Sequence, residues 1–406
     1  MKNLFVFIAI FLISSCIGPV KELENQINDV YFSSPLDETP EPLPENFQNK
    51  INVNSPWIAD FDELPDHPEI VFEDEFIYLI TSSGNFKKID DKTSKVVFSK
   101  QLDSNVSSGI YADPKKQNFF FIDKDNYLNK IDEQANKIWR IKLSNFTQLS
   151  PYFFNNQIIL KYKNNKIDSF DKELGTLLWT YARSNPPLSI TTQSPILISD
   201  DILYSGFPGG KVGVLDPASG TFLSELTVSR SKGVTDIDKT NDISGNLAII
   251  DNLLLASSYN GQMACFDRAS GSKLWNREVN SYHGLVSDSV NVILTHLNDS
   301  IYNFDKKTGK TIWKNSDLQH RKISSPLIFK NLMLTVDYLG IIHVLDLDEG
   351  VRQAIFQFDK SFEGLVDFGD SLAIRDTINT SKLYKHKDFV YIILNHSKII
   401  KISINE

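Results

Sequence analysis

The chain has 406 residues, and its 51 Asp and Glu outnumber its 42 Lys and Arg, so the formal net charge is −9. No block of Lys and Arg stands out, which excludes the electrostatic footprint of a nucleic-acid-binding protein. The length could hold two domains. The 27 Phe and 14 Tyr, against only 3 Met, favour an interior made of β-strands.

The first residues have the pattern of a lipoprotein signal peptide. Lys2 supplies a positive charge, and the apolar run from Leu4 to Ile13 is too short to cross a bilayer as a helix. Ser14 and Ser15 then stand immediately before Cys16, which resembles a bacterial lipobox. We therefore expect residues 1–15 to be removed and Cys16 to be acylated, which anchors the chain to a membrane. The alternative is an ordinary signal peptide with an incidental cysteine.

The residue after Cys16 predicts which membrane holds the anchor. Ile17 stands where many Gram-negative lipoproteins retained at the inner membrane have Asp. We expect anchoring to the outer membrane, on its periplasmic face. Residues 16–50 then form a tether, because Ser34–Glu45 is acidic and proline-rich and should be extended and solvated.

A turn motif recurs along the rest of the chain. In five copies an Asp stands four residues before a Gly, and two further copies have Ser or Asn at the Gly position. The pairs are Asp90/Ser94, Asp132/Asn136, Asp171/Gly175, Asp216/Gly220, Asp267/Gly271, Asp305/Gly309 and Asp346/Gly350. The Asp carboxylate can accept hydrogen bonds from backbone amides of its own turn, and Gly can adopt a positive φ there. The pattern predicts a β-hairpin at each copy.

An aromatic position follows each turn at a nearly fixed offset, eight residues after the Asp in six copies and seven residues after it in the copy with Trp139. Its occupants are Phe98, Trp139, Trp179, Ser224, Trp275, Trp313 and Ala354. A Trp at this position offers a large apolar surface for packing one sheet against the next. The aspartates are 42, 39, 45, 51, 38 and 41 residues apart. Units of this length without helical spacing indicate stacked or radially arranged β-sheets.

The count of units predicts an all-β, eight-bladed β-propeller of four-stranded antiparallel blades over residues 51–406. Seven units contain the turn, and an eighth apolar unit from about Phe362 to Ile404 lacks its outer strand. Trp57 precedes Phe98 by 41 residues, one repeat length, with no complete unit before it. We expect the strand around Trp57 to complete the last blade, because closure removes two exposed sheet edges.

No catalytic or metal-binding constellation emerges from the sequence. The seven His residues are scattered singly, and Cys265 is expected to be a small buried hydrophobe. The segment 206–211 resembles a phosphate-binding loop only loosely, and we interpret it as a hairpin turn. The acidic segment 236–242 lacks the Gly and Glu of a calcium loop, because position twelve is Leu247. We expect no cofactor, no metal and no enzymatic activity.

Two connections between units are longer than the others, and insertions in a repeat protein often carry its function. They cover residues 183–193 and 229–242 and should lie side by side on one rim of the ring. Leu188 and Ile190 give the first an apolar tip, and Asp236 and Asp238 give the second acidic groups. Apolar residues rimmed by charge are typical of a protein–protein contact. The alternative is that both loops pack over the end of the ring.

The turn-and-Trp repeat, the eight-unit count, the lipobox and the Thr235–Asp238 loop together resemble the BamB family. These are lipoproteins of the outer-membrane β-barrel assembly machinery, with repeats like those of pyrroloquinoline-quinone enzymes. The resemblance covers essentially the whole mature chain. It implies that Leu188, Ile190, Asp236 and Asp238 contact BamA through its periplasmic POTRA domains. One departure is Thr191, where the family has an arginine after the second apolar residue.

The implied function is that of a non-catalytic scaffold subunit that helps to deliver nascent outer-membrane proteins for insertion. The resemblance also implies contact with other subunits of the assembly complex. Two alternatives remain open at this point. One is a periplasmic propeller lipoprotein that binds another protein or a polysaccharide. The other is a quinone-dependent dehydrogenase, although those enzymes often carry adjacent cysteines and this chain has none.

Overall fold

The computed structural model describes residues 39–113, 118–147, 149–184, 186, 188–189, 194–230, 240–357, 381–394 and 396–405. The chain divides into two compact units, Met1–Pro42 and Leu43–Glu406, and every strand of the described residues lies in the second. The signal peptide and Cys16 lie outside the described residues. Within the described part of the chain, no helix is long and apolar enough to cross a membrane.

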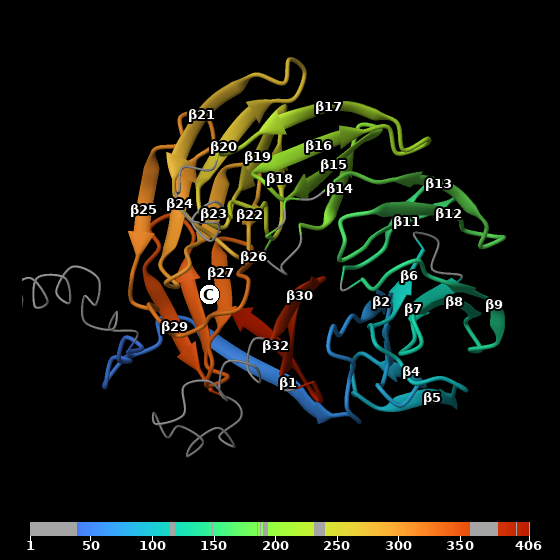
Figure 1. Cartoon of the computed structure of the whole chain (residues 1–406). Coiled ribbons are helices and arrows are strands. Elements are labelled where there is room, and N and C mark those ends of the chain that lie inside the picture. Colours follow the sequence, from blue (N-terminus) through green and yellow to red (C-terminus); the bar gives the residue numbers. More distant parts are fainter. Residues whose placement is uncertain are drawn as a thin grey trace, which may run out of the picture. The chain divides into compact units, whose positions relative to one another are not determined.

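The second unit consists of eight four-stranded antiparallel sheets that follow one another around a ring (Figure 1). Each sheet is a blade whose first strand lies nearest the centre. Blade 1 contains β2 (Val71–Glu73), β3 (Phe76–Ile80), β4 (Asn85–Asp90) and β5 (Val96–Gln101). Blade 2 contains β6 (Tyr111–Ala112), β7 (Asn118–Ile122), β8 (Tyr127–Asp132) and β9 (Lys137–Lys142). Blade 3 contains β10 (Tyr152–Phe154), β11 (Gln157–Lys161), β12 (Ile167–Asp171) and β13 (Leu177–Tyr181).

The next four blades repeat this order along the chain. Blade 4 contains β14 (Ile196–Ser199), β15 (Ile202–Phe207), β16 (Lys211–Leu215) and β17 (Phe222–Thr227). Blade 5 contains β18 (Ala248–Ile250), β19 (Leu253–Ser257), β20 (Gln262–Asp267) and β21 (Lys273–Glu278). Blade 6 contains β22 (Leu285–Ser287), β23 (Asn291–Thr295), β24 (Ile301–Asp305) and β25 (Thr311–Asn315). Blade 7 contains β26 (Leu327–Phe329), β27 (Leu332–Val336), β28 (Ile342–Asp346) and β29 (Arg352–Phe356).

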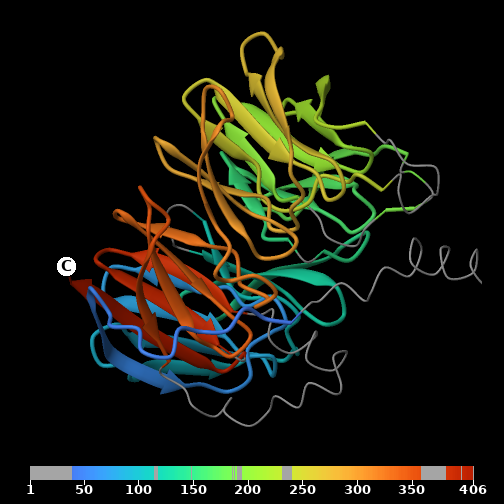
Figure 2. The same cartoon turned by 90° about the vertical axis from the view of Figure 1, so that its left-hand side faces the viewer.

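Blade 8 joins the two ends of the propeller, as the sequence predicts. It contains β30 (Lys382–His386), β31 (Phe389–Leu394) and β32 (Lys398–Asn405), and its outer strand is β1 (Asn52–Asp60). Both views show β1 lying against β32 (Figure 1, Figure 2). Trp57 pairs with Lys401 on the third strand, the register that Trp139 has with Lys130 in blade 2. The eight-bladed, all-β prediction and the closure by the Trp57 strand are confirmed.

The repeated turn has the predicted geometry. In blade 5 the Asp267 carboxylate accepts the Ser270 amide at 2.8 Å, and the Asp267 carbonyl accepts the Gly271 amide at 2.8 Å. Gly271 has φ +69°, a conformation that side chains with a Cβ rarely adopt. The pKa of Asp267 is lowered, first by the Ser270 hydroxyl and then by the turn amides, because these donors favour the ionised carboxylate.

Burial follows the position of a strand in its blade. The second and third strands are mostly buried on both sides, because each sheet is covered by its two neighbours; in blade 8 all of Val390–Leu394 is buried. The core consists of clusters between adjacent blades, such as the one that joins Tyr204 and Leu226 of blade 4 to Leu254 and Phe266 of blade 5. Cys265 is fully buried, as predicted, and burial raises the pKa of its thiol to about 12.

Candidate partner-binding face

Antiparallel order assigns the connections to two opposite faces of the propeller. The Asp turns between third and fourth strands lie on one face, together with the turns between first and second strands. The connections that leave a fourth strand for the next blade lie on the other face, together with the turns between second and third strands. We call this second face the connection face. The two long connections, residues 182–195 and 228–247, both belong to it.

The described ends of both long connections reach the same hairpin turn between β15 and β16. Phe207 pairs with Lys211 across this turn, so the interpretation of segment 206–211 as a hairpin is confirmed. Gly209 and Gly210 have φ +79° and +69°. A Cβ on Gly210 would lie 2.5 Å from the Ser229 carbonyl oxygen, so only glycine lets the second connection approach this closely.

Charged side chains attach the first long connection to blade 4. Arg183 follows β13, and its Nη1 lies 2.9 Å from Glu225 Oε2 on β17. Lys211 Nζ lies 2.9 Å from the other oxygen of the same carboxylate. Lys161 is buried and donates to the carbonyls of Ser194, at 3.1 Å, and Gly206. Burial, with a contribution from the positive charge of Arg183, lowers the pKa of Lys161 to about 7.

Hydrogen bonds attach the second long connection to the same turn. The Val228 amide donates to the Gly210 carbonyl at 2.9 Å. The Gly209 amide donates to Asp242 Oδ1 at 3.0 Å, and Asn241 Nδ2 donates to Ser229 Oγ at 3.1 Å. Ser229, Asn241 and Asp242 are all buried. The bases of the two long connections are therefore held together on one rigid element.

Of the predicted contact residues, Leu188 is described, and 45% of its surface is exposed. Ile190, Asp236 and Asp238, and also Thr191, lie outside the described residues. The connection face carries another exposed apolar residue that sequence reasoning missed. Phe146 is 62% exposed on the connection between β9 and β10, one blade before Leu188. In the sequence, Phe146 is a single aromatic residue within a polar connection of ordinary length, so no pattern marked it.

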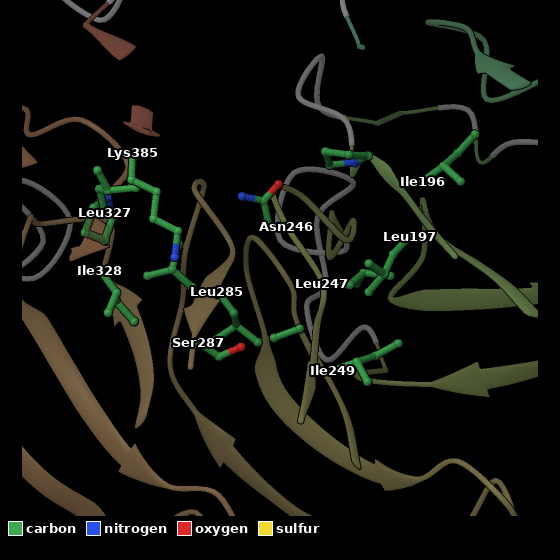
Figure 3. Close-up of a pocket in the computed structure, with 14 residues that line it drawn as sticks. Ile196, Leu197, Asn246, Leu247, Ile249, Leu285, Ser287, Leu327, Ile328 and Lys385 are labelled. Carbon is green, nitrogen blue, oxygen red and sulfur yellow. The ribbon is translucent and has the colours of Figure 1, made fainter. Parts of the chain in front are cut away.

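A pocket of about 420 Å³ opens among the innermost strands (Figure 3). Leu197 and Leu247 lie on one side of it, and Leu327 and Ile328 lie on the other. Among the described residues of its lining, Lys385 of β30 is the only ionisable one.

One buried cluster resembles a catalytic arrangement in its residue types. Asp337 accepts hydrogen bonds from Arg321 Nη2 at 2.6 Å and faces His343 Nε2 at 3.0 Å. Burial raises the pKa of Asp337, but its interactions with His343 and Arg321 hold it below the ordinary value. The His343 side chain is completely buried, so a substrate cannot reach it. No group of three or more potential metal ligands occurs in the described ranges.

Comparison with known proteins gives the family. Residues 82–315, more than half of the chain, match the family model described as outer membrane protein assembly factor BamB. An outer membrane protein assembly factor BamB from Burkholderia pseudomallei (strain K96243) is 26% identical over 79% of this chain and 84% of its own length.

Solved structures agree in fold. BamB from Moraxella catarrhalis has a TM-score of 0.74 at 18% identity, over 87% of this chain and all of that chain. Quinohemoprotein alcohol dehydrogenase from Comamonas testosteroni has a TM-score of 0.62 at 10% identity, over 86% and 76% of the two chains. Likeness at this level shows the propeller fold alone, which proteins of unrelated function share. The family model decides between these two neighbours: the chain belongs to the family of outer membrane protein assembly factors BamB.

Proposed function

We propose that this chain is a non-catalytic scaffold that docks on BamA through its connection face and assists the insertion of β-barrel proteins into the outer membrane. The observation that carries the proposal is the exposure of Leu188 on a connection whose ends are firmly anchored. A large apolar side chain held away from the core suits contact with another protein.

Anchoring of the two long connections supports binding in a physical way. A loop whose ends are already ordered loses less conformational entropy when it binds, so more of the contact energy appears as affinity. Ile190 would extend the apolar contact of Leu188. Asp236 and Asp238 would add negative charge beside it, which steers and orients a basic partner surface.

The remaining parts of the proposal concern location and clients. Acyl chains on Cys16 would hold the protein to the periplasmic face of the outer membrane, where BamA and nascent outer-membrane proteins meet. The tether over residues 16–50 would set the distance between propeller and membrane. Other subunits of the assembly complex and the nascent proteins themselves are further expected partners.

Capture of BamA from detergent-solubilised membranes tests the docking surface. We expect Leu188→Asp to lower capture strongly, because a carboxylate would be placed in an apolar contact. The matched control is Leu174→Asp in the turn between β12 and β13. Leu174 is 72% exposed but lies on the opposite face of the propeller. Both variants should keep the melting temperature of the wild type, since both positions are exposed.

The acidic pair is tested in the same assay. Replacing Asp236 and Asp238 with Ala should weaken capture and make the remainder less sensitive to salt, because exposed charges act mainly through screened long-range attraction. Equal capture by wild type, the Leu188 variant and the double Asp variant would refute docking through this face. Alcohol oxidation on addition of pyrroloquinoline quinone and calcium would refute the non-catalytic reading.

A further inference from the structure

Tryptophan side chains close the seams between blades in one repeated way. The indole on the fourth strand of one blade covers the turn glycine of the next blade. A Cβ on Gly220, Gly309 or Gly350 would lie 2.4 Å from the ring of Trp179, Trp275 or Trp313, respectively. These seams therefore show which side chain this geometry accepts: a flat indole ring pressed against a glycine that has no side chain.

The indole N–H has a repeated partner as well. Trp179, Trp275 and Trp313 donate from Nε1 to the carbonyl of the residue that follows the turn Asp. The acceptors are Pro217 at 3.2 Å, Lys306 at 3.1 Å and Leu347 at 3.0 Å. Trp57 of β1 makes the same bond to the Asp91 carbonyl at 2.8 Å. Each such seam thus combines an apolar face with one directed acceptor.

The seam between blades 4 and 5 lacks its ring. Ser224 occupies the Trp position on β17, paired with Val214 in the register that Trp275 has with Cys265. A Cβ on Gly271 would meet Leu226 Cδ2 at 3.5 Å and nothing closer. The equivalent acceptor is the Arg268 carbonyl, which receives no hydrogen bond from any described residue. Both recognition features of the other seams are present without an occupant.

A pocket adjoins this seam, and its described lining includes Leu226 and Gly271 but neither Ser224 nor Arg268. It measures about 460 Å³, within the usual range for binding pockets of roughly 300–1,000 Å³. β17 provides Glu225 and Leu226 on one side, and blade 5 provides Phe266, Gly271 and Lys273 on the other. β17 and the sheet that contains β20 and β21 are neighbours in the ring (Figure 1). The pocket is open to the outside of the propeller rather than to its centre, because both β17 and β21 are outer strands.

Charge at the pocket is predominantly positive. Lys273 Nζ crosses the seam to the Val228 carbonyl at 2.9 Å, and burial followed by the charge of Arg230 lowers the pKa of Lys273. Arg230 itself is exposed at the pocket rim. The one carboxylate among the described lining residues, Glu225, is already paired with Arg183 and Lys211. A ligand segment with acidic groups beside its aromatic ring is therefore favoured over a basic one.

We propose that the pocket between blades 4 and 5 binds a tryptophan side chain of a partner polypeptide, flanked by acidic residues, which supplies the indole that Ser224 omits. The ring lies against Gly271 and Leu226, and the flanking carboxylates approach Arg230 and Lys273. The wall formed by Ser229 and Arg230 begins the 228–247 connection, so one partner can occupy this pocket and the connection face together.

Binding of short peptides to the intact protein tests the proposal. The probe is acetylated, amidated Asp-(5-fluoro-Trp)-Asp, observed by 19F NMR, with Lys-(5-fluoro-Trp)-Lys as the charge control. We expect weak, saturable binding of the acidic peptide and weaker binding of the basic one. Displacement of the probe by unlabelled Asp-Trp-Asp but not by Asp-Ala-Asp identifies the ring as the bound group. Failure of the acidic probe to show saturable binding overturns the proposal.

Two variants locate the binding. Ser224→Trp fills the seam from within and should lower affinity for the acidic probe by about tenfold or more, because the ring loses the surface it would bury. Leu223→Trp adds the same side chain at an exposed neighbouring position of β17 and should leave affinity unchanged. Arg230→Glu, at an exposed position that tolerates substitution, should reverse the preference between the two probes.

Stability provides a separate outcome. Ser224→Trp should melt at or above the temperature of the wild type, because the added ring enters open space and gains the Arg268 acceptor. A lower melting temperature would show that the seam has no room for an indole and would overturn the proposal. Unchanged probe binding in a stable Ser224→Trp protein would overturn it as well. The peptides contain no part of BamA, so these results are independent of the docking experiment above.

Discussion

The ring closure can be tested by removing one indole. Trp57 lies on β1, the strand that precedes blade 1 in sequence and completes blade 8 in space. Only 9% of its surface is exposed, its ring centroid lies 6.1 Å from that of Tyr391, and Nε1 donates to the Asp91 carbonyl at 2.8 Å. The side chain thus links β1 to blade 8 and to the turn of blade 1.

Trp57→Ala should lower the free energy of unfolding by about 3–5 kcal/mol, the range observed when a buried Trp or Phe is truncated to Ala. The hydrogen bond to Asp91 accounts for about 1 kcal/mol of this loss. Trp57→Phe keeps most of the apolar contact and should therefore be intermediate. The assay is equilibrium unfolding in urea, followed by far-ultraviolet circular dichroism so that the lost indole does not alter the signal.

Trp139→Ala is the matched control, because Trp139 has the same register in blade 2. Its Nε1 is buried without a hydrogen-bond partner in the described structure, since Lys130 Nζ takes the equivalent carbonyl of Lys172 at 3.0 Å. We therefore expect a smaller loss at Trp139 than at Trp57. A Trp57→Ala protein that unfolds at the urea midpoint of the wild type would refute the role of β1 in closing the ring. Normal melting after deletion of residues 51–60 would refute it too.

Three further predictions concern single groups in the propeller. The pKa of Lys161 is about 7 in the folded protein, below its unfolded value of 10.5. As the pH rises between these values, the free energy of unfolding of the wild type should therefore increase relative to that of Lys161→Met, by at most about 1.4 kcal/mol per pH unit. Urea unfolding measures this difference. Burial, only partly offset by the backbone amides of Lys322 and Ile323, raises the pKa of Asp299 from 3.8 to about 6. The free energy of unfolding should therefore fall as the pH rises through this window, and Asp299→Asn should abolish the fall. Parallel pH profiles for wild type and variant would contradict this. Gly350→Ala should cost about 1–3 kcal/mol more than Gly271→Ala, because both have φ +69° but only Gly350 lies under an indole; equal melting temperatures would contradict the vacant seam.

The amino-acid sequence determines much of this fold because its repeat is local. An Asp and a Gly four residues apart define a hairpin through hydrogen bonds within the turn, and the short apolar run before the turn defines a buried strand. The recurrence of Trp at one offset then shows that each sheet packs on the next in the same way. Trp57 could be placed in blade 8 because a repeat that lacks one strand requires another segment to provide it.

Contacts between distant parts of the chain were beyond such reasoning. The sequence indicates that residues 183–193 and 229–242 are long, but only the folded ring brings Ser194 and Asp242 to the same β15–β16 turn. Phe146 was missed because a single aromatic residue in a loop of ordinary length has no periodic signal. The eighth unit was expected from about Phe362, which lies outside the described residues, and its first described strand begins at Lys382.

The seam between blades 4 and 5 shows most clearly which features follow from the sequence and which depend on the tertiary structure. The sequence by itself determined that Ser224 replaces a tryptophan, because the offset from Asp216 is fixed. Whether that loss is filled by neighbours or leaves a pocket depends on side chains from two blades, and the tertiary structure decided it: Leu226 approaches Gly271 without covering it. Local patterns specify which positions face a seam, while the volume that remains there is set by every side chain that packs around it.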